Sequence, residues 1–424
     1  MKIIDVVTES NYLYQDINSP NFIQYKIEET EKLRISFFMR IVLFIYIFIK
    51  SLRQISAIIV SLKKDKNLYI YETANQKRAL KPLFQNDKNK LTMSLHSCFK
   101  ADVEFCEILP LLFGALYLPY FCYCFFVKKT ISANHRFLLD KYLISAGYYR
   151  YYQFLLKKHS ISSLVVSNDH NARVRSIILA ANELGIPVTY IQHASVSKYF
   201  PPLNLFSLSC LDGKSSLDIY ERIGFLESKV LITGAIRNFD LTSSKIQIKK
   251  KKVTIGVAVN NFVNVNKLKI YIDKTFNHNS NIILKIRLHP SQMKDEAYYR
   301  EAFMVENVKI VGSWLEPLND FFDSIDVLFS GSSSIHLDAL RVKILPVLLD
   351  IDDGVLDYYG YLEHGCVLSY SDFLSLKKDD YPIEVDKLIS KAIFFDAAID
   401  FNPEQKKRII CTVIDEINNI NNRF

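Results

Sequence analysis

The second half of the chain alternates short apolar runs with amphipathic segments. Runs rich in Val, Ile and Leu predict strands over 253–259, 282–288, 308–311, 326–329 and 345–349. The segments between these runs have the spacing of helices of about ten residues. Strands that alternate with helices indicate βαβ units and a parallel sheet. We therefore predict a doubly wound α/β domain over residues 253–400.

The first half repeats this alternation less regularly. Apolar runs predict strands over 68–71, 164–166, 188–191 and 231–232, and the segment 172–184 predicts a helix that Gly185 ends. We expect an N-terminal α/β domain over 1–240, a basic linker over 241–252 and a last helix within 401–424. The predicted fold class is therefore α/β, with two Rossmann-like, doubly wound domains that face a cleft.

One uncharged run differs from the rest of the chain. Residues 108–127 (ILPLLFGALYLPYFCYCFFV) contain no charged side chain over 20 positions. A helix of that length just crosses a bilayer core of about 30 Å. Pro110 and Pro119 interrupt such a helix. A spanning helix, an interfacial helix and a buried helix of a large domain stay open, and we favour the interfacial one.

The distribution of charge supports the interfacial interpretation. The chain has 53 Lys and Arg against 45 Asp and Glu, a net charge of +8. Residues 128–175 alone hold nine Lys or Arg and two Asp. A basic stretch beside an apolar one suits an anionic membrane leaflet. Because the first residues lack the pattern of a secretory signal, we expect a cytoplasmic protein, peripheral at the inner face of the cell membrane.

Missing motifs exclude several classes of protein. The sequence has no GxGxxG after a strand, no GxxxxGK[ST], no GxSxG and no HExxH. These absences disfavour dinucleotide dehydrogenases, P-loop enzymes, serine hydrolases and zincins. The seven cysteines form no CxxC pair, which disfavours a disulfide framework and a cysteine zinc site. The four lysines at 249–252 are accompanied by no nucleic-acid-binding motif. Asp350, Asp352 and Asp353 are interpreted as a solvated acidic face. We expect no cofactor, no metal ion and no nucleic-acid partner.

A serine-rich segment follows the predicted strand at 326–329. Ligands of open parallel sheets collect at the carboxyl ends of the strands. Hydroxyls and backbone N–H groups at a helix start there predict a phosphate site, with a plain helix cap as the alternative. The segment consists of Ser330, Gly331, Ser332, Ser333 and Ser334.

The predicted strand at 282–288 ends in Arg287, His289 and Pro290. Pro290 disfavours a helical conformation of His289, so the imidazole can stand over the sheet edge. A donor there can bind a phosphate oxygen and stabilise a departing nucleotide. A surface histidine without function is the alternative.

Asp169 and His170 end a strand of the first half. Asp169 can take a proton from an attacking hydroxyl, or it can be only the cap of the next helix. Arg173 and Arg175 follow and can bind an acidic group. His193 ends the next predicted strand and can line the same region. We assign Asp169 as the candidate base and His170, Arg173 and His193 as candidate acceptor contacts.

Two α/β halves, RLHPS at 287–291 and SGSSSIHLDAL at 330–340 resemble bacterial GT-B glycosyltransferases of surface-polysaccharide synthesis. An HP motif with a later serine motif is similar to bacterial sialyltransferases and polysialyltransferases. The resemblance implies a CMP-activated nonulosonic acid as donor. It assigns His289 to the nucleotide phosphate, Ser332–Ser334 to phosphate binding and an acidic residue to the base. Where that family has two acids and a Gly, this chain has Asn168, Asp169 and His170.

The resemblance implies an inverting, metal-independent transfer of the sugar to a hydroxyl of a glycan or glycolipid acceptor, such as capsule, O-antigen or lipooligosaccharide. His289 is then catalytic, and Arg287, Pro290 and the serines, including Ser330, bind the nucleotide-sugar donor. The segments 180–194 and 233–240 also resemble teichoic-acid-type polyol-phosphate transferases, which use CDP-activated donors. A non-catalytic subunit of a polysaccharide assembly complex is a third alternative.

Overall fold

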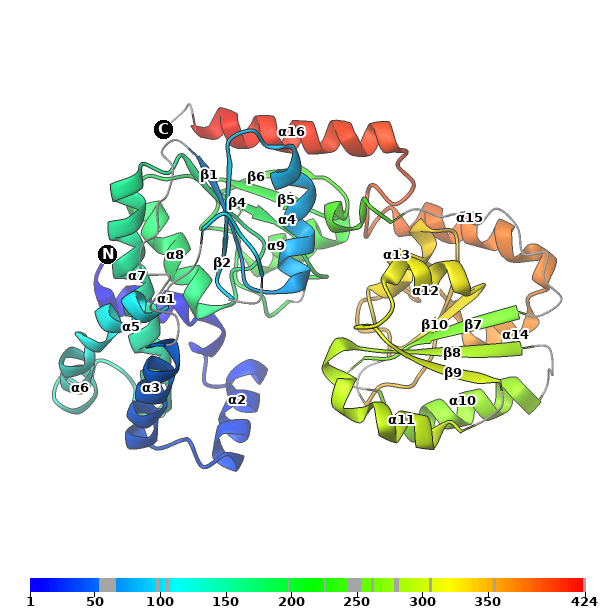
Figure 1. The fold of residues 1–424 in the computed structure, drawn as a ribbon, viewed down its shortest axis with the longest axis horizontal. Helices are drawn as coiled ribbons and strands as arrows, with labels where there is room; N and C mark the ends of the chain where they lie inside the picture. Colours follow the sequence, from blue (N-terminus) through cyan, green and yellow to red (C-terminus); the bar gives the residue numbers. More distant parts are fainter. Residues whose placement is uncertain are drawn as a thin grey trace. The chain divides into compact units, whose positions relative to one another are not determined.

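The computed structural model describes residues 1–52, 66–96, 99–103, 107–196, 198–224, 226–241, 253–260, 263–277, 282–304, 307–353 and 356–421. The chain divides into two compact units (Figure 1). Unit 1 consists of 1–211, 216–237 and 407–424, and unit 2 consists of 212–215 and 238–406. Of the predicted linker over 241–252, only Leu241 lies within the described residues.

Unit 1 contains a six-stranded parallel sheet in the order β2-β1-β3-β4-β5-β6. The first five of these strands are buried almost throughout, as a sheet covered by helices on both faces requires. The strands are β1 (Asn67–Tyr71), β2 (Lys90–Ser94), β3 (Ser163–Val166), β4 (Val188–Ile191), β5 (Leu208–Leu211) and β6 (Lys229–Ile232).

The helices of unit 1 build a layer on this sheet and an extension beyond it. Most side chains of the central helix α7 (Leu139–His159) are buried, since it packs against both the sheet layer and the N-terminal helices. The other helices are α1 (Ile3–Ser10), η1 (Tyr12–Tyr14), α2 (Pro20–Glu31), α3 (Phe37–Ser51), α4 (Ala74–Asn86), α5 (Ile108–Ala115), α6 (Leu118–Phe126), η3 (Ala133–Leu138), α8 (Ala172–Glu183), α9 (Lys214–Ile223) and α16 (Pro403–Asn421).

The uncharged run at 108–127 forms two helices, α5 and α6. Within the described residues no single helix is long and apolar enough to cross a membrane, and α5 and α6 satisfy both conditions only as a pair bent by 45°. A Cβ atom on Gly114 would lie 2.4 Å from the carbonyl oxygen of Leu143, and one on Gly147 would lie 2.0 Å from that of Pro110. The two glycines therefore allow α5 to pack directly on the backbone of α7.

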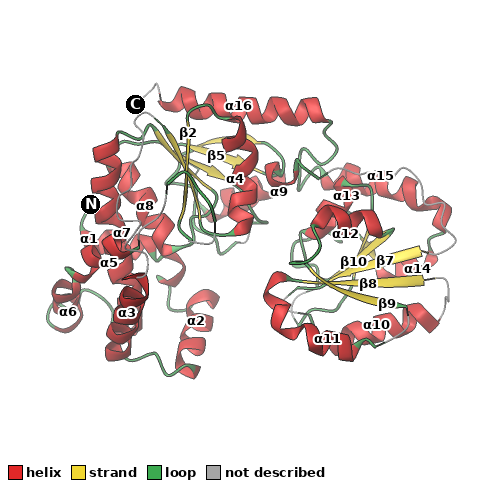
Figure 2. Cartoon of the chain, viewed as in Figure 1, coloured by secondary structure: helices red, strands yellow, loops and turns green. Residues whose placement is uncertain are grey.

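Unit 2 contains a second six-stranded parallel sheet, in the order β12-β11-β10-β7-β8-β9. Its strands are β7 (Val253–Ala258), β8 (Ile282–Leu288), β9 (Val308–Gly312), β10 (Val327–Ser330), β11 (Leu345–Leu348) and β12 (Leu368–Ser369). Its helices are α10 (Val265–Asn277), η5 (Pro290–Asp295), α11 (Glu296–Ala302), α12 (Leu318–Ser324), α13 (Ile335–Arg341), α14 (Tyr370–Ser375) and α15 (Tyr381–Ala392). In Figure 2 each sheet is flanked by helices of its own unit. The predicted α/β class with two doubly wound domains is confirmed.

Each sheet has a point where the chain reverses its direction across the strands. In unit 2 the chain runs from β7 outward through β8 and β9, then returns to β10 on the other side of β7. In unit 1 it runs from β1 to β2 and then returns to β3 on the other side of β1. The crevice outside such a reversal is the usual ligand site of an open α/β sheet. The serine-rich segment 330–334 and Asp169 follow strands at these two reversals, and His289 and His193 follow the neighbouring strands β8 and β4.

Candidate functional sites at the carboxyl ends of the two sheets

The serine loop, residues 330–334, follows β10 at the reversal point of unit 2. The Ser330 hydroxyl donates to the carbonyl of Ala258 at 2.7 Å and so joins β10 to β7. Ser332 Oγ accepts from the N–H of Tyr358 at 3.2 Å, and Ser333 Oγ accepts from Ile335 N–H at 3.4 Å. The hydroxyls of Ser330, Ser332 and Ser333 therefore already have hydrogen-bond partners within the protein. The helix α13 that follows has only seven residues, which limits its dipole.

A carboxylate lies against this loop. Asp352 Oδ2 accepts from the N–H of Ser332 at 2.8 Å and from the amide of Asn260, which follows β7, at 3.2 Å. A Cβ atom on Gly331 would lie 2.3 Å from the same oxygen, so only glycine lets the carboxylate approach this closely. Burial raises the pKa of Asp352. The expectation of a solvated Asp352 is therefore not met, and a phosphate at this loop would compete with its carboxylate.

His289 caps the turn of helix η5 after β8. The N–H of Ser291 donates to His289 Nδ1 at 3.3 Å, and Ser291 Oγ lies 2.8 Å from the same nitrogen. A backbone N–H can only donate, so Nδ1 accepts and a neutral imidazole carries its proton on Nε2. Partial burial lowers the pKa of His289, which favours this neutral form. The exposed side of the ring therefore presents an N–H donor.

Gln292 holds the backbone of His289 in place. Its Oε1 accepts from the N–H of His289 at 2.9 Å, and its Nε2 donates to the carbonyl of Asn260 and to the hydroxyl of Tyr299, both at 2.9 Å. The ends of β7 and β8 are thus joined by one buried amide.

Arg287 lies near the end of β8, and its side chain contacts the segment around α12. Its Nη1 donates to the carbonyl of Glu316 at 2.7 Å, and its guanidinium lies 5.3 Å from the ring centre of Phe321. These contacts join β8 to the segment around α12. Arg287 therefore has a structural role in the arrangement described, beside any contact that it makes with a donor.

Asp169, the candidate base, follows β3 at the reversal point of unit 1 and is 0% exposed. Its Oδ2 accepts from Arg175 at 3.1 Å, and Arg175, also 0% exposed, in turn contacts the carboxylate of Glu9. The alternative role as a helix cap does not apply, because Asn171 is the N-cap of α8, with its side chain accepting from the N–H of Arg173. Asp169 is therefore a buried member of an ion-pair network.

His170 is the neighbour that connects Asp169 to the surface. Its Nδ1 lies 2.9 Å from Oδ1 of Asp169, an ion pair when the imidazole is protonated. Its ring packs 4.1 Å, centre to centre, from that of Phe200 and 6.1 Å from that of His193. Burial, followed by the nearby charges of His170 and Arg237, lowers the pKa of His193 to about 4, so His193 is neutral at pH 7. The structure thus brings Asp169, His170 and His193 together.

Arg173 joins the loops after β1 and β3. Its guanidinium lies 3.4 Å from a carboxylate oxygen of Glu72 and 2.6 Å from one of Glu107. The Asn171 amide also donates to Glu72, at 2.7 Å. These contacts fix the loop that carries His170, while the charge of Arg173 is balanced by two carboxylates.

A cavity of about 470 Å³ adjoins this loop, entirely within unit 1. His170 and Arg173 line it together with side chains from η1, α2 and α7. Its lining residues are Ser10, Tyr14, Tyr25, Asp140, Lys141, Ile144, Asn168, His170, Asn171, Ala172 and Arg173. We define this space as the unit 1 cavity. It falls within the range of small-molecule sites, about 300–1,000 Å³.

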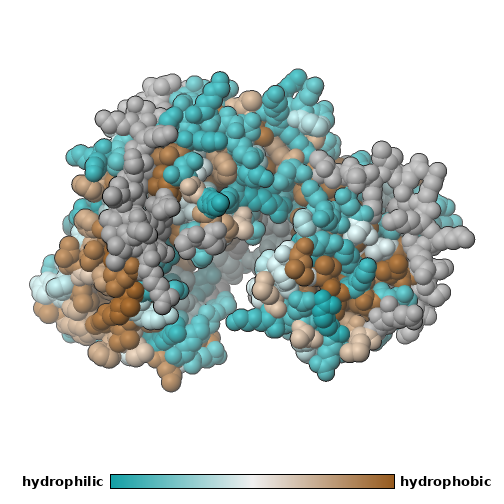
Figure 3. All heavy atoms as spheres, viewed as in Figure 1, coloured by the Kyte–Doolittle hydropathy of each residue, from teal (hydrophilic) through white to brown (hydrophobic). Residues whose placement is uncertain are grey.

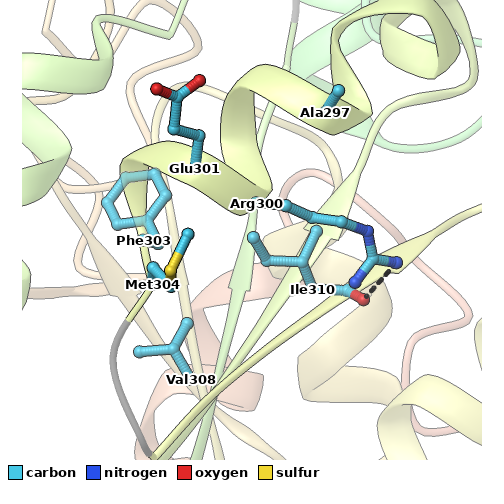
Figure 4. A pocket seen from close by; sticks show the side chains of 7 residues that line it. All are labelled: Ala297, Arg300, Glu301, Phe303, Met304, Val308 and Ile310. Carbon is cyan, nitrogen blue, oxygen red and sulfur yellow. Dashed lines mark hydrogen bonds between the residues drawn. The ribbon is translucent and has the colours of Figure 1, made fainter.

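A second cavity, of about 670 Å³, lies between α11 and β9 of unit 2. Figure 4 shows Phe303, Met304 and Val308 on one side of it and Arg300 bonded to the carbonyl of Ile310 on the other. None of the site residues predicted from the sequence lines this cavity, and its lining is largely apolar.

An apolar face is exposed on α3 and α6 of unit 1. The ring of Phe37 packs 4.9 Å from that of Phe126, which brings the two helices together. In Figure 3 hydrophobic residues gather over these two helices. The exposed apolar side chains are Phe38, Val42, Ile45, Tyr46 and Ile49 of α3, and Tyr120, Tyr123 and Phe126 of α6 with Leu116 and Val127 at its ends. We define these residues as the apolar face; Lys50, Lys128 and Lys129, also exposed, adjoin its helices in sequence.

Sequence analysis missed Lys141, Tyr14 and Tyr25, which line the unit 1 cavity, and His336, which supports the serine loop. His336 Nε2 lies 2.9 Å from the carbonyl of Gly331, and burial lowers the pKa of His336 to about 4. The sequence offered one signal for Lys141, a charged pair with Asp140 at the start of the apolar first half of α7.

Comparisons with known proteins locate the fold. No protein-family model and no curated protein matches the chain. A solved UDP-N-acetylglucosamine 2-epimerase gives a TM-score of 0.55 at 14% identity, over 84% of this chain and 97% of that chain. The UDP-GlcNAc 2-epimerase from Neisseria meningitidis, bound to UDP-GlcNAc, gives 0.50 at 14%, over 82% and 100%. A glycosyltransferase from Rickettsia africae gives 0.50 at 10%, over 84% and 98%.

These likenesses show the fold and nothing narrower, because the identities are low. The fold is GT-B-like, the kind found in these epimerases and in this glycosyltransferase, as the sequence predicted. The narrower resemblance to sialyltransferases stays a prediction.

Proposed function

We propose that this protein is a GT-B glycosyltransferase that moves a sugar from a nucleotide-activated donor to a hydroxyl of a surface glycan. One observation carries the proposal: a polar cavity beside His170 in unit 1 accompanies the polar strand ends of unit 2. A transferase needs two ligand sites, for donor and acceptor. An epimerase, which the fold also suits, needs a site for only one substrate.

We assign the donor to unit 2. The Nε2–H of His289 can donate to a phosphate oxygen, and the hydroxyls of Ser333 and Ser334 are two further donors near the sheet end. Such preorganised donors stabilise the negative charge that develops as the nucleotide leaves. They supply this stabilisation without a metal ion, so we propose metal-independent transfer. Ser330 and Arg287 support this region through their contacts to the backbone.

We assign the acceptor to the unit 1 cavity. The acceptor oxygen attacks the anomeric carbon, the bond from that carbon to the phosphate oxygen breaks, and the electron pair leaves with the nucleotide. His170 takes the proton of the acceptor hydroxyl, and the adjacent carboxylate of Asp169 stabilises the imidazolium by its charge. The buried Asp169 thus acts through His170. One displacement of this kind inverts the configuration at the anomeric carbon.

The donor that we propose is a CMP-activated nonulosonic acid, on the strength of the HP and serine motifs. A CDP-activated polyol phosphate is the second candidate, favoured by the segments at 180–194 and 233–240.

A donor screen tests these assignments. The full chain is incubated with CMP-, UDP- and GDP-sugars and with CDP-glycerol and CDP-ribitol, each with and without a mixture of surface-glycan acceptors, and products are identified by mass spectrometry. Acceptor-dependent transfer from a CMP-sugar in EDTA supports the proposal. Transfer only from a CDP-alcohol supports the second candidate, and conversion of UDP-GlcNAc to its epimer without an acceptor overturns both. Saturable nucleotide binding without any turnover indicates a non-catalytic subunit.

We also propose that the protein works at the cytoplasmic, anionic face of the cell membrane. The apolar face on α3 and α6 combines exposed aromatic and aliphatic side chains with the neighbouring Lys50, Lys128 and Lys129. Apolar burial and attraction to anionic lipids together account for interfacial binding. In this arrangement α5 belongs to the protein core, and α6 supplies the surface.

A further inference from the structure

The unit 1 cavity contains one cation, Lys141, for which the described residues show no ion pair, although Asp140 and Glu29 attract it from farther away. Lys141 lies half-buried on α7, with its Nζ 4.7 Å from the ring centre of Tyr14 and 4.5 Å from that of Tyr25. Within the described part of the chain, no carboxylate oxygen lies within ion-pair distance of this ammonium group, and no hydrogen bond is made to it. Burial lowers the pKa of Lys141, since removal from water disfavours the charged form.

The neighbouring buried cations differ from Lys141 in this respect. Arg40 lies 2.5 Å from a carboxylate oxygen of Glu29 and 3.5 Å from one of Asp140. Arg173 is paired with two carboxylates, and Arg175 with Asp169 and Glu9. A buried charge is costly unless it is paired. The protein thus neutralises the arginines around the cavity and leaves the ammonium group of Lys141 to a ligand.

The remaining walls indicate the chemistry of that ligand. Tyr14 and Tyr25 present aromatic rings, Asn168 presents an amide, and the ring of His170 stands at the loop after β3. Asp140 also lines the cavity, and its carboxylate is paired with Arg40. Aromatic rings with a few polar groups are typical of small-ligand pockets. Lys141 adds the requirement for a negative charge.

We propose that the unit 1 cavity binds an anionic sugar, with its carboxylate or phosphate at Lys141. This inference rests on the proposed function and deepens it: the acceptor carries an acidic sugar whose charged group anchors on Lys141, while a hydroxyl reaches His170. Lys141 is then a binding residue that selects the acceptor.

Binding to the full chain, without any nucleotide, tests the inference separately from transfer. Calorimetry compares glucuronic acid with its uncharged methyl ester, N-acetylneuraminic acid with its methyl ester, and glucose 6-phosphate with glucose. We expect each anion to bind about tenfold or more tightly than its neutral partner, the effect of one hydrogen bond to a charged group. Preference for the acids alone identifies a carboxylate acceptor, and preference for the phosphate alone identifies a phosphorylated one.

Variants locate the effect on Lys141. Lys141→Met removes the charge and keeps the aliphatic length, and Lys157→Met makes the same change at an exposed position of the same helix. We expect Lys141→Met to abolish the preference for anions, with neutral sugars unaffected, and Lys157→Met to preserve it. Equal binding of the anion and its neutral partner in all three pairs by the unmodified protein overturns the inference, even if Lys141→Met fails to fold. Anion binding without sugar transfer from any donor would retain the cavity and refute the proposed function.

Discussion

The two units build their candidate sites at equivalent places in two similar sheets, yet from different kinds of residues. In unit 2 the polar groups follow their strands directly: Asn260 after β7, His289 after β8 and the serine loop after β10. In unit 1 the loop after β3 and His193 after β4 do so, whereas the rest of the cavity comes from N-terminal helices and α7.

This difference separates two ways of constructing a ligand site. Loops that follow adjacent strands meet because the sheet brings their ends together, so a donor site of this kind needs little beyond the fold. The unit 1 cavity needs helices that are remote in sequence and are held by tertiary packing and by ion pairs such as those of Arg40 and Arg175. We expect nucleotide binding by unit 2 to tolerate changes in those helices. Acceptor binding in the unit 1 cavity should depend on them.

The largest effect is expected from His170→Ala. Without a proton acceptor, kcat for transfer should fall about 10²- to 10⁴-fold. Hydrolysis of the donor by water should change less, because departure of the nucleotide depends on unit 2. His159→Ala, a histidine at the end of α7, is the control and should keep full turnover. Transfer at the normal rate by His170→Ala would remove it from the mechanism.

His289→Ala should slow donor hydrolysis as well as transfer, unlike His170→Ala. Loss of the Nε2–H donor removes stabilisation of the leaving phosphate, so both transfer and donor hydrolysis should fall about 10²- to 10³-fold in kcat. Affinity of the protein for an anionic sugar alone should not change, because that site lies in unit 1. Single-turnover rates with acceptor measure transfer, and those without acceptor measure donor hydrolysis. A loss confined to transfer would contradict the division of roles between the units.

Gly147→Ala tests how far the acceptor side depends on helix packing. The added Cβ would meet the Pro110 carbonyl at 2.0 Å, so α5 must move away from α7. Overpacking of this kind destabilises by about 1–3 kcal/mol. Thermal unfolding should show the loss, together with weaker anionic-sugar binding but unchanged nucleotide binding. Gly224→Ala is the control, since its nearest neighbour would be a side-chain carbon at 3.4 Å.

The same contrast explains what the sequence could predict. Strands β4 and β8 coincide with the predicted ranges, because β-branched and other residues typical of strands dominate VTYI and IILKIRL. Strands β2 and β5 were missed, since KLTMS and LSCL mix polar and apolar residues.

For the candidate sites, His289 and the serine loop could be selected because strand ends can be read from the sequence. The approach of Asp352 to Gly331, and of Tyr14 and Tyr25 to Lys141, could not be predicted. These contacts depend on tertiary packing of segments that are far apart in the chain.

A smaller effect is expected from Asp352→Asn. The carboxylate of Asp352 opposes a phosphate at the serine loop, and its pKa is raised by burial. As the pH falls through that pKa the carboxylate gains a proton, so affinity for a nucleotide-sugar should rise as the pH is lowered towards 4. The phosphodiester keeps its charge over this range. Asp352→Asn should bind about tenfold more tightly at pH 7, equivalent to about 1.4 kcal/mol, and lose the pH dependence. Weaker binding by this variant would show that the carboxylate contacts the donor favourably.

The smallest effects are expected at the membrane, where the two units should again differ. Lys128→Gln or Lys129→Gln, each next to the apolar face of unit 1, should lower partitioning of the full chain onto phosphatidylglycerol vesicles about fivefold. Lys309→Gln, an exposed lysine of unit 2, is the matched control and should leave partitioning unchanged. Phe38→Ser, on α3, should weaken binding to both anionic and neutral vesicles, because it removes apolar contact instead of charge. Equal losses from the lysines of both units would mean that attraction is spread over the whole protein, and the apolar face would then be a docking site for another subunit of the assembly.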